Sequence, residues 1–154
     1  MQALPHHYNV TVAVSDKRPA EIMSRELISL TSAPPLQFGG PGNLWSPETL
    51  LVAAVADCLV LTFKAIAKLS QLQWNNITCD ADGAVDRCDG VTRFTAMRLQ
   101  AHLVLPAGAD NELAQRVIQK AERACLIGNS LKCERMLEVE ITMDAETATL
   151  APSA

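Results

Sequence analysis

One long apolar helix constrains this chain more than any other feature of its sequence. Ser46 is followed by a proline and then by Glu48. This order is typical of a helix start: an N-cap, a proline at the first helical position and an acid near the positive end of the dipole. Apolar residues then continue to about Leu72 and cover most of the circumference. We therefore expect a central helix that is buried on most sides, in part by a second subunit.

Strands are expected on both sides of this helix, because apolar and polar residues alternate there. The predicted strands cover residues 8–14, 26–31, 77–85, 97–105 and 137–143. A second, amphipathic helix is predicted over residues 110–126, and the small, polar tail at residues 146–154 is predicted to fray. The order ββ-α-ββ-α-β, with short links, predicts a single α+β domain spanning residues 1–154 and built on an antiparallel sheet.

Composition and charge exclude several classes of protein. The chain is 49% hydrophobic and 19% charged, which is typical of a globular domain, and its net charge is −4. Without a basic stripe, this charge argues against a nucleic-acid partner. The first residues have neither a basic start nor an apolar run, and the longest apolar stretch, residues 50–63, is too short to span a bilayer. We expect a cytoplasmic protein with no membrane partner.

The five cysteines favour redox chemistry over a structural role. Their odd number and scattered spacing argue against a disulfide framework, and without a Cys-x-x-Cys pair no metal site is expected. Cys79, Cys88 and Cys133 fall in predicted strands or turns and are interpreted as structural or incidental. Cys58 and Cys125 lie on the apolar stripes of the two predicted helices. Such a pair can cycle between dithiol and disulfide, although a single buried cysteine is more commonly an inert apolar side chain.

A reactive Cys58 needs a neighbouring group that stabilises its thiolate. Cys58 lies about three turns into the helix, so the helix dipole contributes little, and an arginine from elsewhere in the fold is the expected cation. Glu48 precedes Cys58 by ten residues, which is roughly 15 Å along a helix. One chain therefore cannot bring both to one site, whereas two helices packed antiparallel in a dimer can. Alternatively, Glu48 only complements the helix dipole.

Two segments resemble the OsmC/Ohr family, which comprises osmotically inducible protein C and the organic hydroperoxide resistance proteins. From residue 38 the chain reads Phe-Gly-Gly-Pro-Gly-Asn, then Ser-Pro-Glu, and then a cysteine ten residues after Glu48. From residue 124 it reads Ala-Cys-Leu-Ile-Gly-Asn-Ser, which is similar to the family's second-cysteine segment. The order of the predicted elements also agrees with the family over essentially the whole chain.

The resemblance implies a fold, an activity and roles for individual residues. It implies an OsmC-like intertwined homodimer with two active sites at the subunit interface, each served by both chains. It also implies a thiol-dependent peroxidase that prefers organic hydroperoxides, uses an external dithiol as reductant and needs no cofactor. Carried over by position, Cys58 is the peroxidatic cysteine, Cys125 the resolving cysteine and Glu48 the acid that holds a catalytic arginine.

The catalytic arginine is where the chain departs from the family pattern. The family's peroxidases place it in a Gly-Gly-Arg-like turn after the first strand, and this sequence has no such motif. Arg18, in the predicted turn at residues 15–19, is the candidate, and Arg25 is its rival. The second-cysteine segment also reads Cys-Leu-Ile where the peroxidases usually have Cys-Pro. Both departures indicate a divergent OsmC-like branch.

Three apolar residues, Phe38, Leu51 and Val55, are expected to form the substrate-binding wall and to suit a fatty or aromatic hydroperoxide. Two other kinds of function stay open at this point. One is a non-catalytic module that binds a small apolar ligand in the same interface, which the missing arginine motif favours. The other is a stress-linked structural dimer without a ligand.

Overall fold

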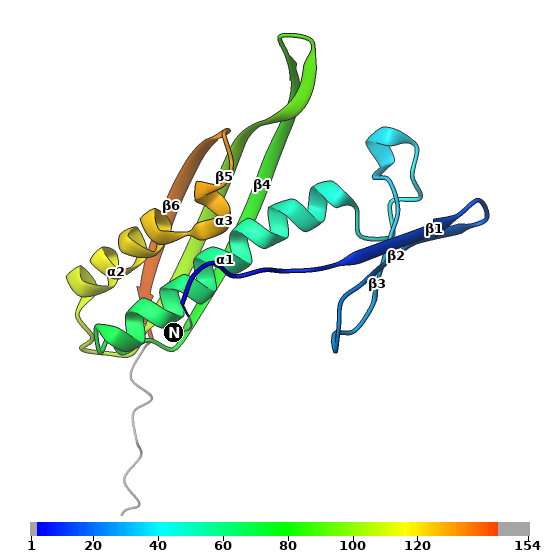
Figure 1. Cartoon of the computed structure of the whole chain (residues 1–154). Helices are drawn as coiled ribbons and strands as arrows, with labels where there is room; N and C mark the ends of the chain where they lie inside the picture. The colour runs from blue at the N-terminus through cyan, green and yellow to red at the C-terminus, as the bar shows by residue number, and fades with distance from the viewer. Residues whose placement is uncertain (1–2, 145–154) are drawn as a thin grey trace, which may run out of the picture. The chain divides into compact units, whose positions relative to one another are not determined.

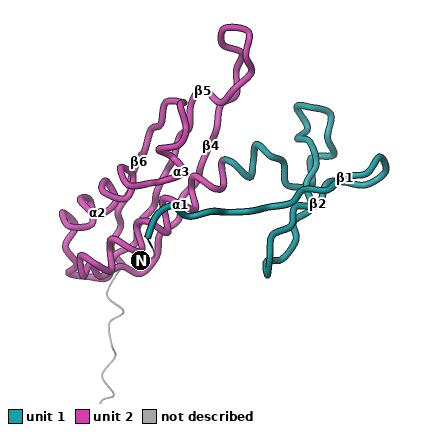
Figure 2. The backbone as a smooth tube through the Cα atoms, in the orientation of Figure 1, with its two compact units in different colours: residues 1–51 teal, residues 52–154 magenta. Residues whose placement is uncertain are grey.

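The computed structural model describes residues 3–144, so the predicted frayed tail at residues 146–154 lies outside the described residues. The chain divides into two compact units, residues 1–51 and residues 52–154 (Figure 2). The single domain expected from the sequence stays a prediction.

The first unit is a three-stranded antiparallel sheet (Figure 1). Its strands are β1 (Thr11–Ser15), β2 (Arg18–Met23) and β3 (Leu30–Ser32), paired in the order β1-β2-β3. The strand predicted at residues 26–31 is wrong over residues 26–29, because Glu26 has a φ of 62° and belongs to a turn, and β3 begins only at Leu30. Strand β2 was not predicted at all. Pro19 looks like a breaker, but the first residues of a strand accept a proline.

A loop rich in glycine and proline leads from this sheet to the first helix. It contains a short 3₁₀ turn, η1 (Leu36–Phe38). An ideal Cβ built on Gly40 would lie 1.6 Å from the carbonyl oxygen of Pro34, so no side chain fits at this position. Ser46 then caps the helix: the N–H of Thr49 donates to its Oγ at 3.2 Å, and its own N–H donates to Oγ1 of Thr49 at 2.9 Å. The predicted helix start is confirmed.

Helix α1 (Pro47–Leu69) begins where the sequence predicts and ends three residues before Leu72. The chain leaves the helix near Gln71, whose φ is 54°. Over an 18-residue window α1 has a mean hydropathy of 2.1, so it is long and apolar enough to cross a membrane. The core helix of a soluble protein can have the same length and composition. The expectation from the sequence concerns only the stretch at residues 50–63, which is shorter than the whole helix, and the buried side chains of α1 belong to a protein core.

The second unit contains a mixed three-stranded sheet. Its elements are β4 (Asn76–Cys88), β5 (Val91–Leu105), α2 (Asn111–Ala124), α3 (Leu126–Asn129) and β6 (Glu134–Met143). Strands β4 and β5 are antiparallel, but β6 runs parallel to β5 (Figure 1). The expected antiparallel sheet is wrong for this pair, because the chain crosses from β5 to β6 through two helices and returns in the same direction.

The core of the second unit lies between the sheet and helices α1 and α2. The buried side chains come from all three of these parts, with Leu59 and Phe63 on α1, Leu103 on β5 and Ile118 on α2 each 0% exposed. The ring of Phe63 also meets Trp74 edge-on, at a centroid distance of 5.4 Å. This packing fixes α1 against the sheet, against α2 and against the segment that leads from α1 to β4.

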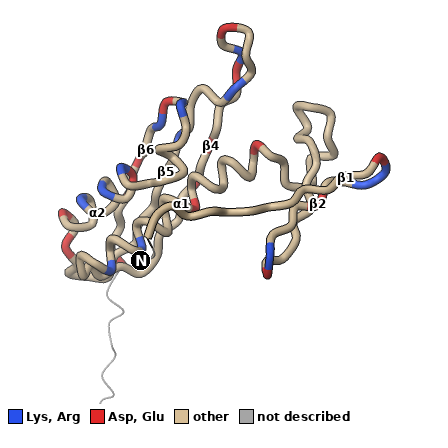
Figure 3. The backbone as a smooth tube through the Cα atoms, viewed as in Figure 1, with Lys and Arg blue, Asp and Glu red and all other residues tan. Residues whose placement is uncertain are grey.

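Charged residues of both signs meet at the turns of the two sheets. Figure 3 shows acidic and basic residues side by side at the β1–β2 turn of the first unit and at the β4–β5 turn of the second. Between β5 and β6, Arg98 forms an ion pair with Glu138 at 3.0 Å. The carboxylate of Glu138 also accepts a hydrogen bond from Gln100 at 2.9 Å. The charge on these surfaces is therefore mixed.

Candidate functional site: a pair of cysteines in the second unit

Cys58 lies in the middle of α1 and is partly exposed. Its Sγ lies 4.0 Å from the hydroxyl oxygen of Thr62, one helical turn further on. The helix places Cys58 on the side that faces the α2–α3 junction, since hydrogen bonds reach its sulfur from the N–H groups of Leu126 and Ile127. The sulfur is therefore both accessible and surrounded by donors.

Cys125 lies at the break between α2 and α3, where it ends one helix and caps the next. Its side chain is 3% exposed, and its Sγ accepts a hydrogen bond from the N–H of Gly128 at 3.4 Å. The same sulfur donates to the carbonyl oxygen of Val55 on α1 at 3.9 Å. The extended backbone of Cys125, with a ψ of 104°, interrupts the helix and turns the thiol toward α1.

The structure places the side chains of Cys58 and Cys125 near enough for each to shift the pKa of the other. Burial raises the pKa of the Cys58 thiol, but the N–H of Ile127 and the thiol of Cys125 lower it. With smaller contributions from Thr62 and Leu126, the pKa of Cys58 ends below the ordinary value of a thiol. A thiolate at Cys58 is thus stabilised by hydrogen bonds.

The pKa of Cys125 is shifted in the opposite direction. Burial raises it, the N–H of Gly128 lowers it, and the hydrogen bond and negative charge of Cys58 raise it further. The charge of Arg135 lowers the pKa of Cys125, but the net pKa is above the ordinary value. Of the two thiols, Cys58 therefore loses its proton first as the pH rises.

A third thiol lies close to this pair. Burial raises the pKa of Cys79 on β4 to about 11, and the charges of Asp80 and Cys125 act in the same direction. A thiol with such a high pKa stays protonated and unreactive at neutral pH. This agrees with the interpretation of Cys79 as a structural residue.

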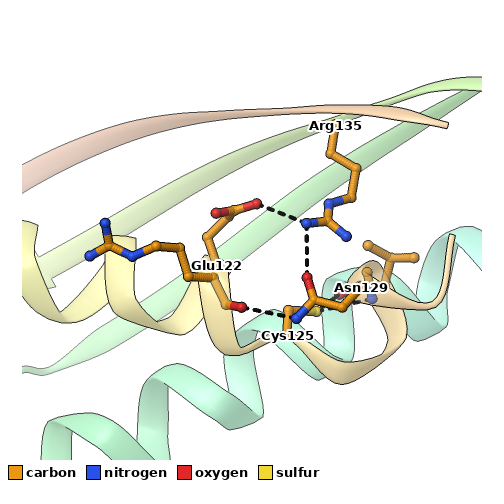
Figure 4. A network of polar contacts seen from close by, with 7 residues as sticks. Glu122, Cys125, Asn129 and Arg135 are labelled. Carbon is orange, nitrogen blue, oxygen red and sulfur yellow. Dashed lines mark hydrogen bonds and ion pairs between the residues drawn. The ribbon is translucent and has the colours of Figure 1, made fainter. Parts of the chain in front are cut away.

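A cation beside Cys125 is one that sequence reasoning missed. Arg135, at the start of β6, lowers the pKa of Cys125 through its charge. Figure 4 shows its guanidinium group held over the α2–α3 junction by Glu122 and Asn129, with Nη2–O distances of 3.3 and 3.1 Å. No sequence motif marks these three residues, because they meet only after β6 folds beside β5.

Two of the predicted site residues, Arg18 and Glu48, line one pocket in the first unit. This pocket has a volume of about 430 Å³, and Phe38 forms part of its wall. The Oε2 atom of Glu48 is buried and has no hydrogen-bond partner among the described residues. Among the ion pairs within residues 3–144, none joins Arg18 to Glu48. The two residues therefore line the same pocket but do not form an ion pair there.

The remaining candidates lie in different surroundings. Leu51 is half-buried at the end of the first unit, whereas Val55 is 0% exposed in the core of the second. The rival arginine, Arg25, is exposed and pairs with Glu26 at 3.7 Å. Among the described residues, no group of three or more histidine, cysteine or acidic side chains could hold a metal ion. The functional roles of these candidates stay predictions.

Comparison with known proteins identifies relatives of this chain. Residues 40–148 match the protein family described as OsmC-like protein. An uncharacterized protein, YmaD from Bacillus subtilis, is 28% identical over 130 residues, which cover 81% of this chain and 86% of YmaD. Peroxiredoxin OsmC from Escherichia coli is 27% identical over 96 residues, which cover 62% of this chain and 66% of that protein.

Solved structures show the same fold. An OsmC-like protein of unknown function from Vibrio cholerae has a TM-score of 0.82 at 18% identity, covering 88% of this chain and 100% of its own. An organic hydroperoxide resistance protein OsmC from Legionella pneumophila has a TM-score of 0.69 at 18% identity, covering 90% of this chain and 99% of its own. At these identities the likeness concerns the fold alone. Together with the match over residues 40–148, it shows that this chain belongs to the OsmC-like protein family.

Proposed function

We propose that this protein is a thiol-dependent peroxidase that reduces organic hydroperoxides. The observation that carries the proposal is the contact between the side chains of Cys58 and Cys125, whose pKa values are shifted in opposite directions. An attacking sulfur has to be a thiolate, and a second thiol within reach is needed to complete a disulfide. Membership of a family that includes a peroxiredoxin supports the same activity.

The proposed cycle has three steps. The Cys58 thiolate attacks the terminal oxygen of the hydroperoxide, so that the O–O bond breaks, an alcohol leaves after protonation and Cys58 becomes a sulfenic acid. Cys125 then attacks the sulfur of Cys58, and the S–O bond breaks with release of water. An external dithiol reduces the resulting disulfide and is itself oxidised, which returns both thiols.

A catalytic arginine is proposed at Arg18. In this proposal Glu48 accepts paired hydrogen bonds from the guanidinium group and fixes it, so that Arg18 orients the peroxide and stabilises the Cys58 thiolate. The shared pocket and the unpaired Oε2 atom of Glu48 support this assignment. Because Glu48 and Cys58 are ten residues apart on α1, one copy of the chain would supply the acid and arginine and another copy the cysteine.

The substrate class follows from the apolar character of the proposed wall. Several prolines and Phe38 line the pocket that contains Arg18 and Glu48. With Leu51 and Val55, they are proposed to favour a fatty or aromatic hydroperoxide over hydrogen peroxide. We place this reaction in the cytoplasm, where external dithiols are kept reduced.

Stopped-flow consumption of cumene hydroperoxide tests the proposal. Cys58→Ser should abolish consumption, because the attacking sulfur is lost. Cys125→Ser should allow one turnover for each Cys58 and then stop, since the sulfenic acid cannot be resolved. Cys88→Ser, at the far end of β4, is a matched control that should leave the steady rate within twofold. Steady turnover by the Cys58→Ser protein would falsify the scheme.

A second candidate function is favoured by the pocket of the first unit. Its volume of about 430 Å³ and its apolar lining could hold a small apolar ligand without any chemistry at the cysteines. Titration of the thiols separates the two candidates. A pKa of Cys58 near 8.5 or above would favour the binding module, whereas a clearly lower pKa would favour the peroxidase.

A further inference from the structure

The guanidinium group of Arg135 is fixed in place rather than free in solvent. Its side chain is 21% exposed, and Nη2 donates to Oε1 of Glu122 at 3.3 Å and to Oδ1 of Asn129 at 3.1 Å. Asn129 is itself held, since its Nδ2 donates to the carbonyl oxygen of Arg123 at 2.9 Å. Residues from α2, α3 and β6 therefore fix one cation at the α2–α3 junction (Figure 4).

The absence of a side chain at Gly128 allows this cation to approach Cys125. An ideal Cβ built on Gly128 would lie 3.0 Å from Nη1 of Arg135 and 3.2 Å from Sγ of Cys125. The two groups therefore lie on either side of the space that a side chain would occupy. Gly128 is buried and has no left-handed φ, so its role here is to leave room rather than to permit a turn.

We propose that Arg135 is a positioning residue that stabilises the thiolate of Cys125 while the disulfide with Cys58 is made and broken. This inference rests on the proposed function. In disulfide formation, the sulfur of Cys125 attacks Cys58 as a thiolate, so it must first lose its proton. In reduction, Cys125 must leave with the electron pair of the S–S bond. Both steps place a negative charge on the sulfur that Arg135 faces.

The direction of reduction follows from exposure. Cys58 is partly exposed and Cys125 is buried, so an external dithiol reaches the sulfur of Cys58 first. The thiolate of the external dithiol forms a mixed disulfide with Cys58, and the S–S bond between Cys58 and Cys125 breaks. The second thiol of the reductant then releases Cys58 and closes the oxidised reductant. A lower pKa of the leaving thiol speeds the first of these exchanges.

Several charged or titratable groups face Cys125 from the elements packed around it. They are Cys58 from α1, Cys79 from β4 and Arg135 from β6, with Glu122 of α2 behind the guanidinium group. Among these described groups, only Arg135 is positively charged. Glu122 weakens its field at Cys125 but fixes its position, so removing Arg135 should raise the pKa of Cys125.

The first measurement is alkylation of Cys125 by iodoacetamide as a function of pH, resolved by peptide mass spectrometry in a Cys58→Ser background. Arg135→Gln should move the midpoint upward by about one pH unit, given the attraction of a partly screened charge at this range. Arg135→Lys should restore much of the shift. Arg123→Gln, which removes an exposed cation from the last turn of α2, is the matched control and should change nothing. A merely structural role would speed alkylation at every pH without moving the midpoint.

The second measurement is the reduction by dithiothreitol of a Cys58–Cys125 disulfide formed with oxidised dithiothreitol, without any peroxide. Arg135→Gln should slow this reduction roughly threefold at neutral pH, because the leaving thiol is more basic. Gly128→Ala, which inserts a methyl group between cation and sulfur, should act in the same direction and carries the test if Arg135→Gln does not fold.

The outcomes separate this inference from the proposed function. An unchanged alkylation midpoint together with an unchanged reduction rate would overturn the role of Arg135, even in a protein that consumes hydroperoxide. Conversely, if the protein consumes no hydroperoxide but Arg135→Gln still changes both the alkylation midpoint and the reduction rate, the role of Arg135 beside Cys125 is supported. The peroxidase proposal is then wrong.

Discussion

Cys58 and Cys125 are the same chemical group in two environments, and the environments decide which sulfur acts first. Three donors at the α2–α3 junction lower the pKa of Cys58: the N–H groups of Leu126 and Ile127 and the thiol of Cys125. Burial raises the pKa of Cys125, and the charge of Cys58 adds to this effect. The proposed attacking and resolving roles therefore rest on local hydrogen bonding rather than on residue type.

The pH dependence of the peroxide reaction should follow Cys58. Only the thiolate attacks, and its folded-state pKa is lowered, so the rate should be full above that pKa and fall as the pH drops through it. We expect the half-maximal rate at a pH below about 8.5, the ordinary thiol pKa. Stopped-flow mixing of cumene hydroperoxide with Cys125→Ser across pH measures it in a single turnover. The serine of that variant still carries a hydroxyl that can donate to Cys58, so the lowered midpoint should be kept, and a midpoint at or above about 8.5 would contradict the assignment.

At this scale, the sequence predicted the cysteine pair but not its surroundings. Cys58 and Cys125 could be chosen because each lies on an apolar helical stripe and in a family-like segment. Arg135 could not, since an arginine at the start of a strand carries no local signal and its partners Glu122 and Asn129 come from other elements. The arginines that the sequence suggested, Arg18 and Arg25, both lie before the first helix.

Among the elements, α2 shows most directly how a local signal fixes a functional position. Asp110 caps the helix: its Oδ1 accepts the N–H of Leu113 at 2.8 Å. The buried face of the helix, which includes Val117 and Ile118, packs on the core and brings the end of α2 to Cys58. The start of α2 thus helps to set where Cys125 lies.

Replacement of this cap should therefore weaken the helix that carries Cys125. Asp110→Ala leaves one N–H without its acceptor, and we expect a loss of about 1 kcal/mol in the free energy of unfolding. Urea unfolding followed by circular dichroism measures this loss. Asp110→Asn is the control, because it keeps an oxygen acceptor and should retain most of the stability. Equal losses in both variants would show that the charge, not the hydrogen bond, matters.

Long, regular elements were predictable, whereas the connections between them were not. The two main helices and the strand ending at Leu105 follow from their own periodicity. The parallel pairing of β5 with β6 and the break at Cys125 depend on how the chain crosses the sheet. Strand β2 was missed because the residues beside Arg18 are typical of a turn. Its strand conformation depends on pairing with β1 on one side and β3 on the other.

For the whole molecule, the two units differ in how well they bury apolar side chains. All of the buried hydrophobic residues described in residues 3–144 belong to the second unit. In the first unit, every residue of β1 is exposed, with Val12 at 58% and Val14 at 74%. A three-stranded sheet without a core is marginal in water. This exposed strand supports the proposed homodimer, in which a second copy would cover it.

Association of the chain should therefore depend on β1. Val12 and Val14 are the two exposed valines of β1, and burying each side chain contributes about 1.5–3 kcal/mol. Sedimentation equilibrium of the unsubstituted protein should give twice the mass of one chain. Replacing both valines with glutamate should weaken association at least about a hundredfold, since each 1.4 kcal/mol is a factor of ten. Gln119→Glu, on the exposed side of α2, adds the same kind of charge and should not affect association. If the protein sediments as a single chain at every concentration, no second copy covers β1. The proposed catalytic site could then not be shared between two copies.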